Sequence, residues 1–238
     1  MFLSDLHLGP HEPGTVQIFL DFLAGPARTA HRLTILGDLF DAWAGDDDLA
    51  DPFNARIVGA LRTLADSGVT VEFMAGNRDF LIGEAFAAAA GLTLLPDPLV
   101  RDVGGIRTLL THGDRLCTDD IDYQRFRAQV RDPAWKASFL AQSLAERKRE
   151  IEALRAASES EKQRKTAAIM DVNADAVAAA FVQYDVQALI HGHTHRQGRH
   201  EYIITGTPRQ RWVLGDWHPG GGNALSCERG DWRWLALG

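Results

Sequence analysis

Short apolar runs that end in polar residues recur along the first part of the chain and predict buried strands. They cover Phe2 to Ser4, Leu33 to Leu36, Val69 to Met74, Arg107 to Thr111 and Val186 to Ile190. Helical patterns such as Val16 to Leu23 and Phe53 to Ala65 lie between them. This alternation of strand and helix is typical of a layered α/β domain.

After His195 the pattern changes to short strands separated by turn residues. The expected strands are Tyr202 to Thr205, Gln210 to Leu214, Ala224 to Cys227 and Trp232 to Leu237. We therefore expect the second half of the sheet structure to be antiparallel. No internal repeat is visible and no Gly/Ser-rich or Pro-rich linker divides the chain, so residues 1–238 are predicted to form a single domain.

Composition narrows the classes of protein that fit. With 45% hydrophobic residues among 238 the chain can build one sizeable core, which excludes disorder as its main state, and the net charge of -7 argues against a general nucleic-acid binder. The weakly polar stretch from Ala85 to Leu95 is far short of the roughly 20 residues that span a bilayer. Asp5 and His7 interrupt any export signal, so we expect a cytoplasmic protein. Cys117 and Cys227 fit two buried thiols better than a disulfide.

One segment differs in charge from the rest of the chain. Between Arg125 and Lys165, eleven Lys or Arg face six Asp or Glu, a local balance of +5. Apolar residues fall on one narrow helical stripe at 100° per residue, namely Leu140, Leu144, Ile151 and Leu154. The pattern predicts a helical insertion. From the residues alone, the favoured interpretation is a helix pair that packs one face on the core and exposes a basic face to solvent.

An acidic run, Asp46 to Asp48, precedes the second predicted helix. Consecutive carboxylates are candidates for a cation site, but this run lacks the Gly and Glu pattern of a calcium loop. We therefore expect a solvated loop without chemistry.

Each predicted strand of the first part is followed by residues of types that bind metals. They are Asp5, His7, Asp38, Asn77, His112, His193 and His195. Sites in α/β sheets form outside the carboxyl ends of strands, so these side chains are expected to converge. Seven ligands without a cysteine are too many for one tetrahedral zinc ion, and they fit two metal ions if Asp38 bridges them. Oxygen and imidazole ligands favour manganese, iron or zinc over magnesium.

The order and spacing of these motifs resemble the calcineurin-like metallophosphoesterases. The motifs are Asp5-Leu6-His7, Gly37-Asp38, Gly76-Asn77, His112 and Gly192-His193-Thr194-His195. The resemblance runs from Phe2 to about His195 and implies an αββα sandwich of two mixed sheets that hydrolyses phosphoesters. It places Asp5, His7, Asp38 and His195 at one divalent ion and Asp38, Asn77, His112 and His193 at the other. Two such ions activate a hydroxide and neutralise charge on the phosphoryl group.

One departure from the family's pattern concerns the residue after the Gly-Asn pair. Most members carry His there as a candidate proton donor, whereas this chain has Arg78. Arginine does not donate a proton near neutral pH, but its guanidinium clamps a phosphate. That chemistry fits a leaving group that needs no proton, such as a phosphate monoester expelled from a pyrophosphate. Asp38, Asn77 and Arg78 are therefore expected to act in catalysis.

Longer motifs narrow the resemblance to a branch of the family in lipid A synthesis. They are Gly37-Asp38-Leu39-Phe40-Asp41, Gly76 to Phe80, His112 to Asp120, and Ile169 to Asn173. The resemblance implies hydrolysis of the pyrophosphate bond of UDP-2,3-diacylglucosamine to UMP and 2,3-diacylglucosamine 1-phosphate (lipid X), with a metal-activated hydroxide attacking the α-phosphorus. It further implies two Mn²⁺ ions and a monomer bound peripherally to the cytoplasmic face of the inner membrane of a Gram-negative bacterium.

The same resemblance implies that residues 121–170 form a helical cap that holds the acyl chains, which changes the interpretation of the insertion from structural to functional. The positions that match the family's substrate contacts are Asn77, Arg78, Asp120, Tyr123, Arg155, Ser158, Lys162, Lys165 and His193. Two alternatives stay open. Another phosphoesterase of this family, acting on a nucleotide or phosphomonoester, is disfavoured by Arg78 and the basic insertion. A non-catalytic scaffold is disfavoured because no metal ligand is lost.

Overall fold

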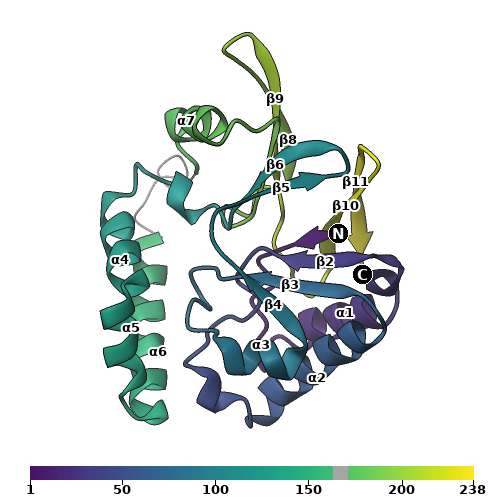
Figure 1. The fold of residues 1–238 in the computed structure, drawn as a ribbon. Coiled ribbons are helices and arrows are strands. Elements are labelled where there is room, and N and C mark those ends of the chain that lie inside the picture. The colour runs from purple at the N-terminus through teal and green to yellow at the C-terminus, as the bar shows by residue number, and fades with distance from the viewer. Residues whose placement is uncertain (163–170) are drawn as a thin grey trace.

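Two mixed β-sheets pack face to face, with helices on the outer face of each (Figure 1). The computed structural model describes residues 1–162 and 171–238, with side chains up to residue 156 and from residue 171 onward. The predicted αββα sandwich is confirmed.

The first sheet has the strand order β11-β10-β1-β2-β3-β4. Its strands are β1 (Phe2–Leu3), β2 (Arg32–Ile35), β3 (Thr70–Met74), β4 (Leu92–Leu95), β10 (Gly222–Glu228) and β11 (Asp231–Leu237). β1 to β4 run parallel, whereas β10 is antiparallel to both β1 and β11. The outer face is covered by α1 (Pro13–Ala24), α2 (Pro52–Asp66) and α3 (Glu84–Ala90), which bury Phe19, Leu61 and Phe86 completely.

The second sheet has the order β5-β6-β7-β9-β8. Its strands are β5 (Leu99–Val103), β6 (Ile106–Leu110), β7 (Ala188–His191), β8 (Gly198–Ile204) and β9 (Thr207–Val213), and α7 (Ala174–Tyr184) covers its outer face. The expectation that all late strands are antiparallel is wrong for β9, which pairs in parallel with β7. The reason is topological: β8 takes the edge of the sheet, and β9 turns back to lie between β8 and β7.

Apolar side chains from both sheets form the layer between them. They include Phe2, Leu36, Met74, Leu110, Ile190, Trp212 and Leu225. This shared core fixes the two sheets against each other. It therefore also fixes the loops that follow β1, β2, β3, β6 and β7, where the motifs that we predict to bind metal lie.

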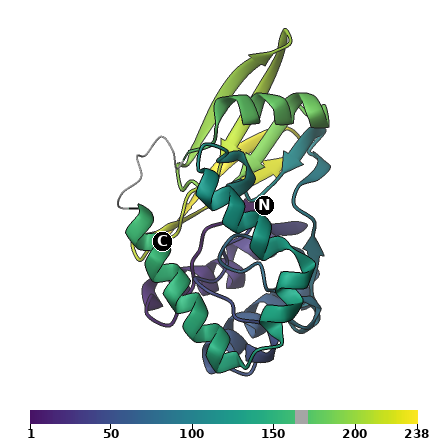
Figure 2. The ribbon, with the colours of Figure 1, turned by 90° about the vertical axis from the view of Figure 1, so that its left-hand side faces the viewer.

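Three helices, α4 (Ile121–Arg131), α5 (Pro133–Leu140) and α6 (Leu144–Lys162), stand together along one side of the molecule (Figures 1 and 2). Asp132 ends α4 and caps α5, accepting the N–H groups of Ala134 and Trp135, and Pro133 fits the first position of α5. Ser143 and Glu146 form a capping box at the start of α6. The predicted single apolar stripe is wrong, because Leu140 ends one helix and Leu144 begins the next.

The acidic run Asp46–Asp48 forms a single helical turn between β2 and α2. All three carboxylates have partners from other elements. These are the indole N–H of Trp43 and the N–H groups of Gly83 and Phe86 for Asp46, Arg147 for Asp47, and Lys148 for Asp48. None of the three residues is buried and Asp47 is exposed, as expected for a solvated loop, but the turn also joins segments that lie far apart in the sequence.

Two expectations about the whole chain concern its thiols and its membrane topology. Cys117 is buried, as predicted, whereas Cys227 is only partly buried, and neither thiol is in a disulfide. Within the described residues, no helix combines the length and apolar character that crossing a bilayer requires.

Candidate active site

The seven residues predicted as metal ligands are brought together at one edge of the two sheets, in two groups. In the first, His195 Nε2 lies 3.2 Å from His7 Nε2 and 3.4 Å from Asp5 Oδ1. In the second, Asn77 Oδ1 lies 2.9 Å from His112 Nε2 and 2.8 Å from His193 Nδ1. Such short separations between groups that bind cations indicate a candidate site for divalent metal.

Asp38 lies between these two groups. Its Oδ2 is 3.9 Å from His7 Nε2, and its Oδ1 is 3.7 Å from His112 Nε2. One oxygen of this buried carboxylate therefore faces each group. Asp38 therefore lies close to a histidine of each group.

Several of these residues adopt a backbone conformation that is unusual for residues other than glycine. The φ angles are 56° for Asp5, 49° for His7, 54° for Asp38, 65° for His193 and 59° for His195. A left-handed conformation at such residues costs energy and persists only where the surrounding structure imposes it. The strain is concentrated at the ligand loops, which is typical of a functional site.

The glycines of the motifs allow the loops to approach each other closely. A Cβ atom at Gly76 would lie 2.1 Å from Asp38 Oδ1, and one at Gly192 would lie 2.1 Å from Ser4 Oγ. Any side chain at either position would displace the neighbouring ligand loop. The two glycines are therefore part of the site's geometry.

Asp5 provides a test of whether these residues fit a cation. Its side chain is completely buried, and its Oδ2 accepts hydrogen bonds from Ser4 Oγ and from the backbone N–H of His193. Its Oδ1 has no hydrogen-bond partner among the described residues. The nearest group that can carry positive charge is the His195 ring, 3.4 Å away and without a hydrogen bond to this oxygen, so a bound divalent cation beside His195 and His7 would satisfy it. The donor set fits metal ions on this ground.

Hydrogen bonds orient the histidines. His112 Nδ1 donates to the carbonyl of Leu36 at 2.8 Å, so in the neutral ring Nε2 is free to bind a cation. On the other side of the site, the carboxylate of Asp216 lies 3.6 Å from His195 Nδ1. A carboxylate behind a ligand histidine is a recurrent feature of metal centres.

The carboxylates also raise the affinity of the site for positive charge. Burial lowers the pKa of His112, but Asp38, Asp114 and Asp5 outweigh it and raise this pKa to about 9. Burial also opposes protonation of His195, yet Asp216 and Asp5 raise its pKa to about 10. When no metal ion is bound, both histidines are therefore protonated and positively charged near neutral pH.

Asp79 is a buried residue whose role sequence reasoning did not identify, although it lies in the motif from Gly76 to Phe80. Its carboxylate accepts backbone N–H groups from Leu39 at 2.7 Å, Gly76 at 2.8 Å and Asp38 at 3.3 Å. It thereby ties the Asp38 loop to the loop that follows β3. Burial, together with the charge of Asp38, raises the pKa of Asp79 to about 7. The local sequence does not reveal this role, because Asp79 and its partner Leu39 are 40 positions apart in the chain.

Hydrogen bonds hold the backbone of Arg78 in place, whereas its guanidinium is free to bind a ligand. Its N–H donates to Asp38 Oδ1 at 2.8 Å, and its carbonyl accepts from the N–H of Trp43. Its guanidinium, in contrast, makes no hydrogen bond or ion pair in the part of the chain that the structure describes, although it lines the cavity beside His7 and Asn77. A partly buried guanidinium of this kind is suited to binding an anion.

A cavity of about 470 Å³ extends from the ligands to the helices α4, α5 and α6. Its polar end includes His7, Asp38, Asn77, Arg78, His193 and His195. Its apolar end is lined by Phe80, Phe126, Trp135, Phe139, Ile151 and Leu154. The cavity thus offers both a cation-binding and an apolar environment to one ligand.

The predicted substrate contacts that the structure describes line this same cavity. They are Asn77, Arg78, Asp120, Tyr123, Arg155 and His193. Asp120 also caps α4 by accepting the N–H of Tyr123, and Arg155 forms an ion pair with Asp41. The predicted contacts Ser158, Lys162 and Lys165 lie outside the residues whose side chains are described.

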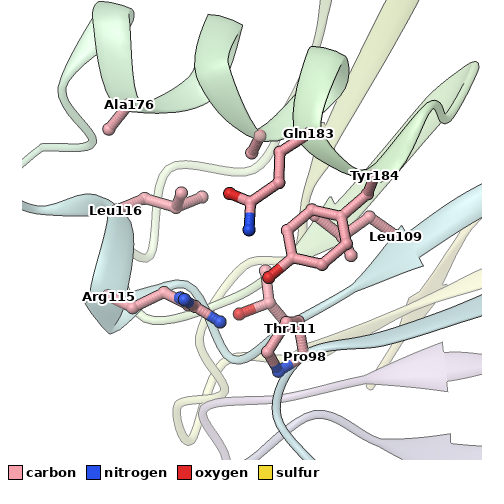
Figure 3. Close-up of a pocket in the computed structure, with 9 residues that line it drawn as sticks. Pro98, Leu109, Thr111, Arg115, Leu116, Ala176, Gln183 and Tyr184 are labelled. Atoms are coloured by element: carbon pink, nitrogen blue, oxygen red, sulfur yellow. The ribbon is translucent and has the colours of Figure 1, made fainter.

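A second, smaller cavity of about 160 Å³ lies on the outer side of the second sheet, between β6 and α7 (Figure 3). Arg115, Gln183 and Tyr184 line it, together with apolar residues such as Leu109 and Leu116. None of the predicted site residues contributes to it, so the chemistry is assigned to the larger cavity.

The chain is similar to several known proteins. The family model described as calcineurin-like phosphoesterase matches residues 1–197. A protein from Aromatoleum aromaticum named UDP-2,3-diacylglucosamine hydrolase is 52% identical over 92% of this chain and 89% of its own length. One of the same name from Chromohalobacter salexigens is 49% identical over 96% of this chain and 92% of its own. Among solved structures, an archaeal phosphodiesterase is similar over 99% of this chain and 98% of its own, with a TM-score of 0.45 and 13% sequence identity.

Proposed function

The chain belongs to the calcineurin-like phosphoesterase family, and we propose that it hydrolyses the pyrophosphate bond of UDP-2,3-diacylglucosamine. The products would be UMP and 2,3-diacylglucosamine 1-phosphate. The name shared by relatives at about 50% identity supports this substrate. The observation that supports the proposal is a cavity with the candidate metal ligands at one end and aromatic and aliphatic side chains at the other. The proposed substrate also has a charged part, the diphosphate, and an apolar part, the two acyl chains.

Two divalent cations, for which we propose Mn²⁺, would be held by the seven ligands. The set would be Asp5, His7, Asp38 and His195 for one ion, and Asp38, Asn77, His112 and His193 for the other. Oxygen and imidazole donors suit Mn²⁺. When bound, the ions lower the pKa of a water molecule and offset the charge of a phosphoryl group.

Arg78 would bind the diphosphate through its available guanidinium. Its backbone is fixed by Asp38, so the side chain projects from a rigid position. The nucleophile would attack the α-phosphorus, and 2,3-diacylglucosamine 1-phosphate would leave. A phosphate monoester leaves without taking up a proton, so an arginine in place of a histidine is compatible with this reaction.

The apolar end of the cavity would bind the acyl chains. We propose that residues 121–170 act as a lipid-binding cap, with Phe126, Trp135, Phe139 and Leu154 contributing apolar surface. Polar groups from the same helices, Asp120, Tyr123 and Arg155, would contact the sugar and phosphates, and Ser158, Lys162 and Lys165 are proposed to extend this set.

The enzyme would work as a monomer on the cytoplasmic face of the inner membrane of a Gram-negative bacterium, without crossing it. A substrate with two acyl chains resides in a bilayer and must leave it to reach the cavity. Ile121, Leu140 and Leu154 are exposed apolar side chains of the cap that would be available for such peripheral contact.

The proposal is tested by incubating the purified protein and Mn²⁺ with UDP-2,3-diacylglucosamine and, in parallel, with p-nitrophenyl phosphate. We expect UMP release from the lipid substrate to exceed phosphate release from the monoester by orders of magnitude in kcat/KM. Equal turnover of both, or turnover of the monoester alone, would favour a general phosphatase.

A further inference from the structure

Basic residues of the cap are used to hold it on the core. Six cations of α4, α5 and α6 contact core groups: Arg127 with Asp114, Arg131 with the Gly76 carbonyl, Lys136 with the Phe80 carbonyl, Arg147 with Asp47, Lys148 with Asp48 and Arg155 with Asp41. The basic charge of the insertion is therefore partly neutralised within the molecule, before any substrate binds.

Arg147 differs from the other five because it is almost completely buried, with 1% of its surface exposed. Its guanidinium donates to the carbonyl of Ala44 at 2.7 Å and to the carboxylate of Asp47. Its Nε has no partner among the described residues. Burying an arginine in this way is costly unless its contacts are well formed, which makes this the most demanding of the six contacts.

Gly45 makes room for the Arg147 side chain. A Cβ at this position would lie 2.3 Å from Arg147 Nη1 and 3.0 Å from Leu140 Cδ2. The φ angle of Gly45 is 136°, a conformation that other residues rarely adopt. The turn next to Asp46–Asp48 is thus shaped to receive this guanidinium.

Arg147 lies on the same face of α6 as residues that line the cavity. Ile151 and Arg155 follow it by four and eight residues, so the three side chains project within about 80° of one another, on one face of the helix. Ile151, Leu154 and Arg155 all line the cavity, and Trp43, on the opposite wall, donates its indole N–H to Asp46. The contact at Arg147 therefore connects the two walls of the cavity.

We propose that Arg147 is a positioning residue: by seating α6 on the turn Gly45–Asp48, it sets the distance between the apolar wall of the cap and the metal ligands. The inference rests on the proposed function, because it assigns the consequence to binding of the acylated substrate. It predicts that loosening this contact weakens binding of the lipid substrate and leaves chemistry at the metal ligands intact.

The experiment compares Arg147→Met, Asp47→Asn and a control, Arg149→Met. Arg149 is exposed on the same helix, and in the described part of the chain its side chain makes no hydrogen bond or ion pair. For Arg147→Met we expect KM for UDP-2,3-diacylglucosamine to rise about tenfold with kcat changed by less than about twofold, and Asp47→Asn to shift KM in the same direction. In the double variant the two increases in KM should not multiply, because both substitutions remove the same contact between Arg147 and Asp47.

Two further measurements separate positioning from general damage. Hydrolysis of bis(p-nitrophenyl) phosphate, which has no acyl chain, should be unchanged in Arg147→Met. Amide hydrogen exchange of residues 144–156 should become faster in Arg147→Met and stay unchanged in Arg149→Met. A second variant, Gly45→Ala, keeps every charge and should reproduce both the KM increase and the faster exchange by displacing Arg147.

Unchanged KM and unchanged exchange in Arg147→Met would overturn the inference. A parallel loss of activity on both substrates, together with loss of Mn²⁺ binding, would also overturn it, because Arg147 would then support the whole fold. If the wild-type protein does not cleave UDP-2,3-diacylglucosamine, the proposed function fails. The exchange measurement still decides whether Arg147 seats α6.

Discussion

The ring of Tyr123, on the first cap helix, stacks on the imidazole of His193, with ring centroids 5.7 Å apart and planes inclined by 28°. The Tyr123 hydroxyl donates to the buried carboxylate of Asp114 at 2.9 Å. One side chain of the cap therefore contacts a proposed metal ligand with its ring and the core with its hydroxyl.

We predict different outcomes for the two parts of Tyr123. Tyr123→Phe keeps the stacking and removes one hydrogen bond to a charged group, so unfolding free energy should fall by about 1.5–3 kcal/mol. Loss of the hydroxyl as a proposed substrate contact should raise KM and leave kcat largely unchanged. Tyr123→Ala also removes the ring and should lower kcat/KM by about tenfold or more. Urea unfolding and steady-state kinetics measure the two effects. Equal kcat/KM for both variants would show that the ring contact is unimportant.

Removal of a bridging or second-group ligand should abolish activity without unfolding the protein. Asp38→Ala and His193→Ala are each expected to lose nearly all turnover, because two-metal positioning supplies most of the rate in such enzymes. The ligands lie in loops beyond the strands, so circular dichroism should remain that of the wild type. Wild-type turnover by metal-loaded Asp38→Ala would exclude the proposed site.

Metal binding should release protons near neutral pH. In the metal-free protein the pKa is about 9 for His112 and about 10 for His195, so both are protonated at pH 7, whereas burial and His112 lower the pKa of His193 to about 4. Binding of both ions should therefore release about two protons, and affinity should rise with pH up to about 9 or 10.

Calorimetry of Mn²⁺ binding in buffers with different ionisation enthalpies counts these protons. His195→Gln is the matched variant and should release about one proton fewer. In the metal-free protein the raised pKa values contribute stability below the ordinary pKa of histidine, and this contribution is lost as pH rises through about 9 and 10. Proton release near zero at pH 7 would contradict the electrostatic description of the site.

Substitution of Arg78 should not be neutral. Arg78→His loses the planar guanidinium, and a charge-assisted contact is worth roughly 1.5–3 kcal/mol, so kcat/KM should fall by about tenfold to a hundredfold. Arg78→Lys keeps the charge without the two parallel donors, so its kcat/KM should lie between those of the wild type and Arg78→His. Mn²⁺ affinity should be unchanged in both variants. A fully active Arg78→His protein would remove the proposed role of the guanidinium.

The sequence is most informative where residue types that bind metals come directly after a predicted strand. Asp5, Asp38, Asn77, His112 and His193 could be placed together because parallel strands end at a common edge. The arrangement of Asp38 between two groups and the left-handed backbone of the ligands depend on packing between sheets, which no local pattern encodes.

Elements with weak or atypical patterns were missed. The Ala-rich stretch before Leu92 forms α3, and β4 and β5 are short strands at sheet edges whose residues alternate little. The start of α6 has a local signal, because Ser143 and Glu146 have the spacing of a capping box. The ion pair of Asp47 with Arg147 joins residues 100 positions apart, so composition showed the basic segment but not its partner.

Hydrolysis in ¹⁸O-labelled water tests most directly the proposal that this chain cleaves a nucleotide-linked pyrophosphate at the α-phosphorus. The purified, Mn²⁺-loaded protein is incubated with UDP-2,3-diacylglucosamine, and both products are analysed by mass spectrometry. Attack at the α-phosphorus, with the acylated sugar phosphate leaving unprotonated beside Arg78, places the label in UMP. Label in 2,3-diacylglucosamine 1-phosphate would mean attack at the other phosphorus and would contradict the proposed roles of Arg78 and the metal ligands.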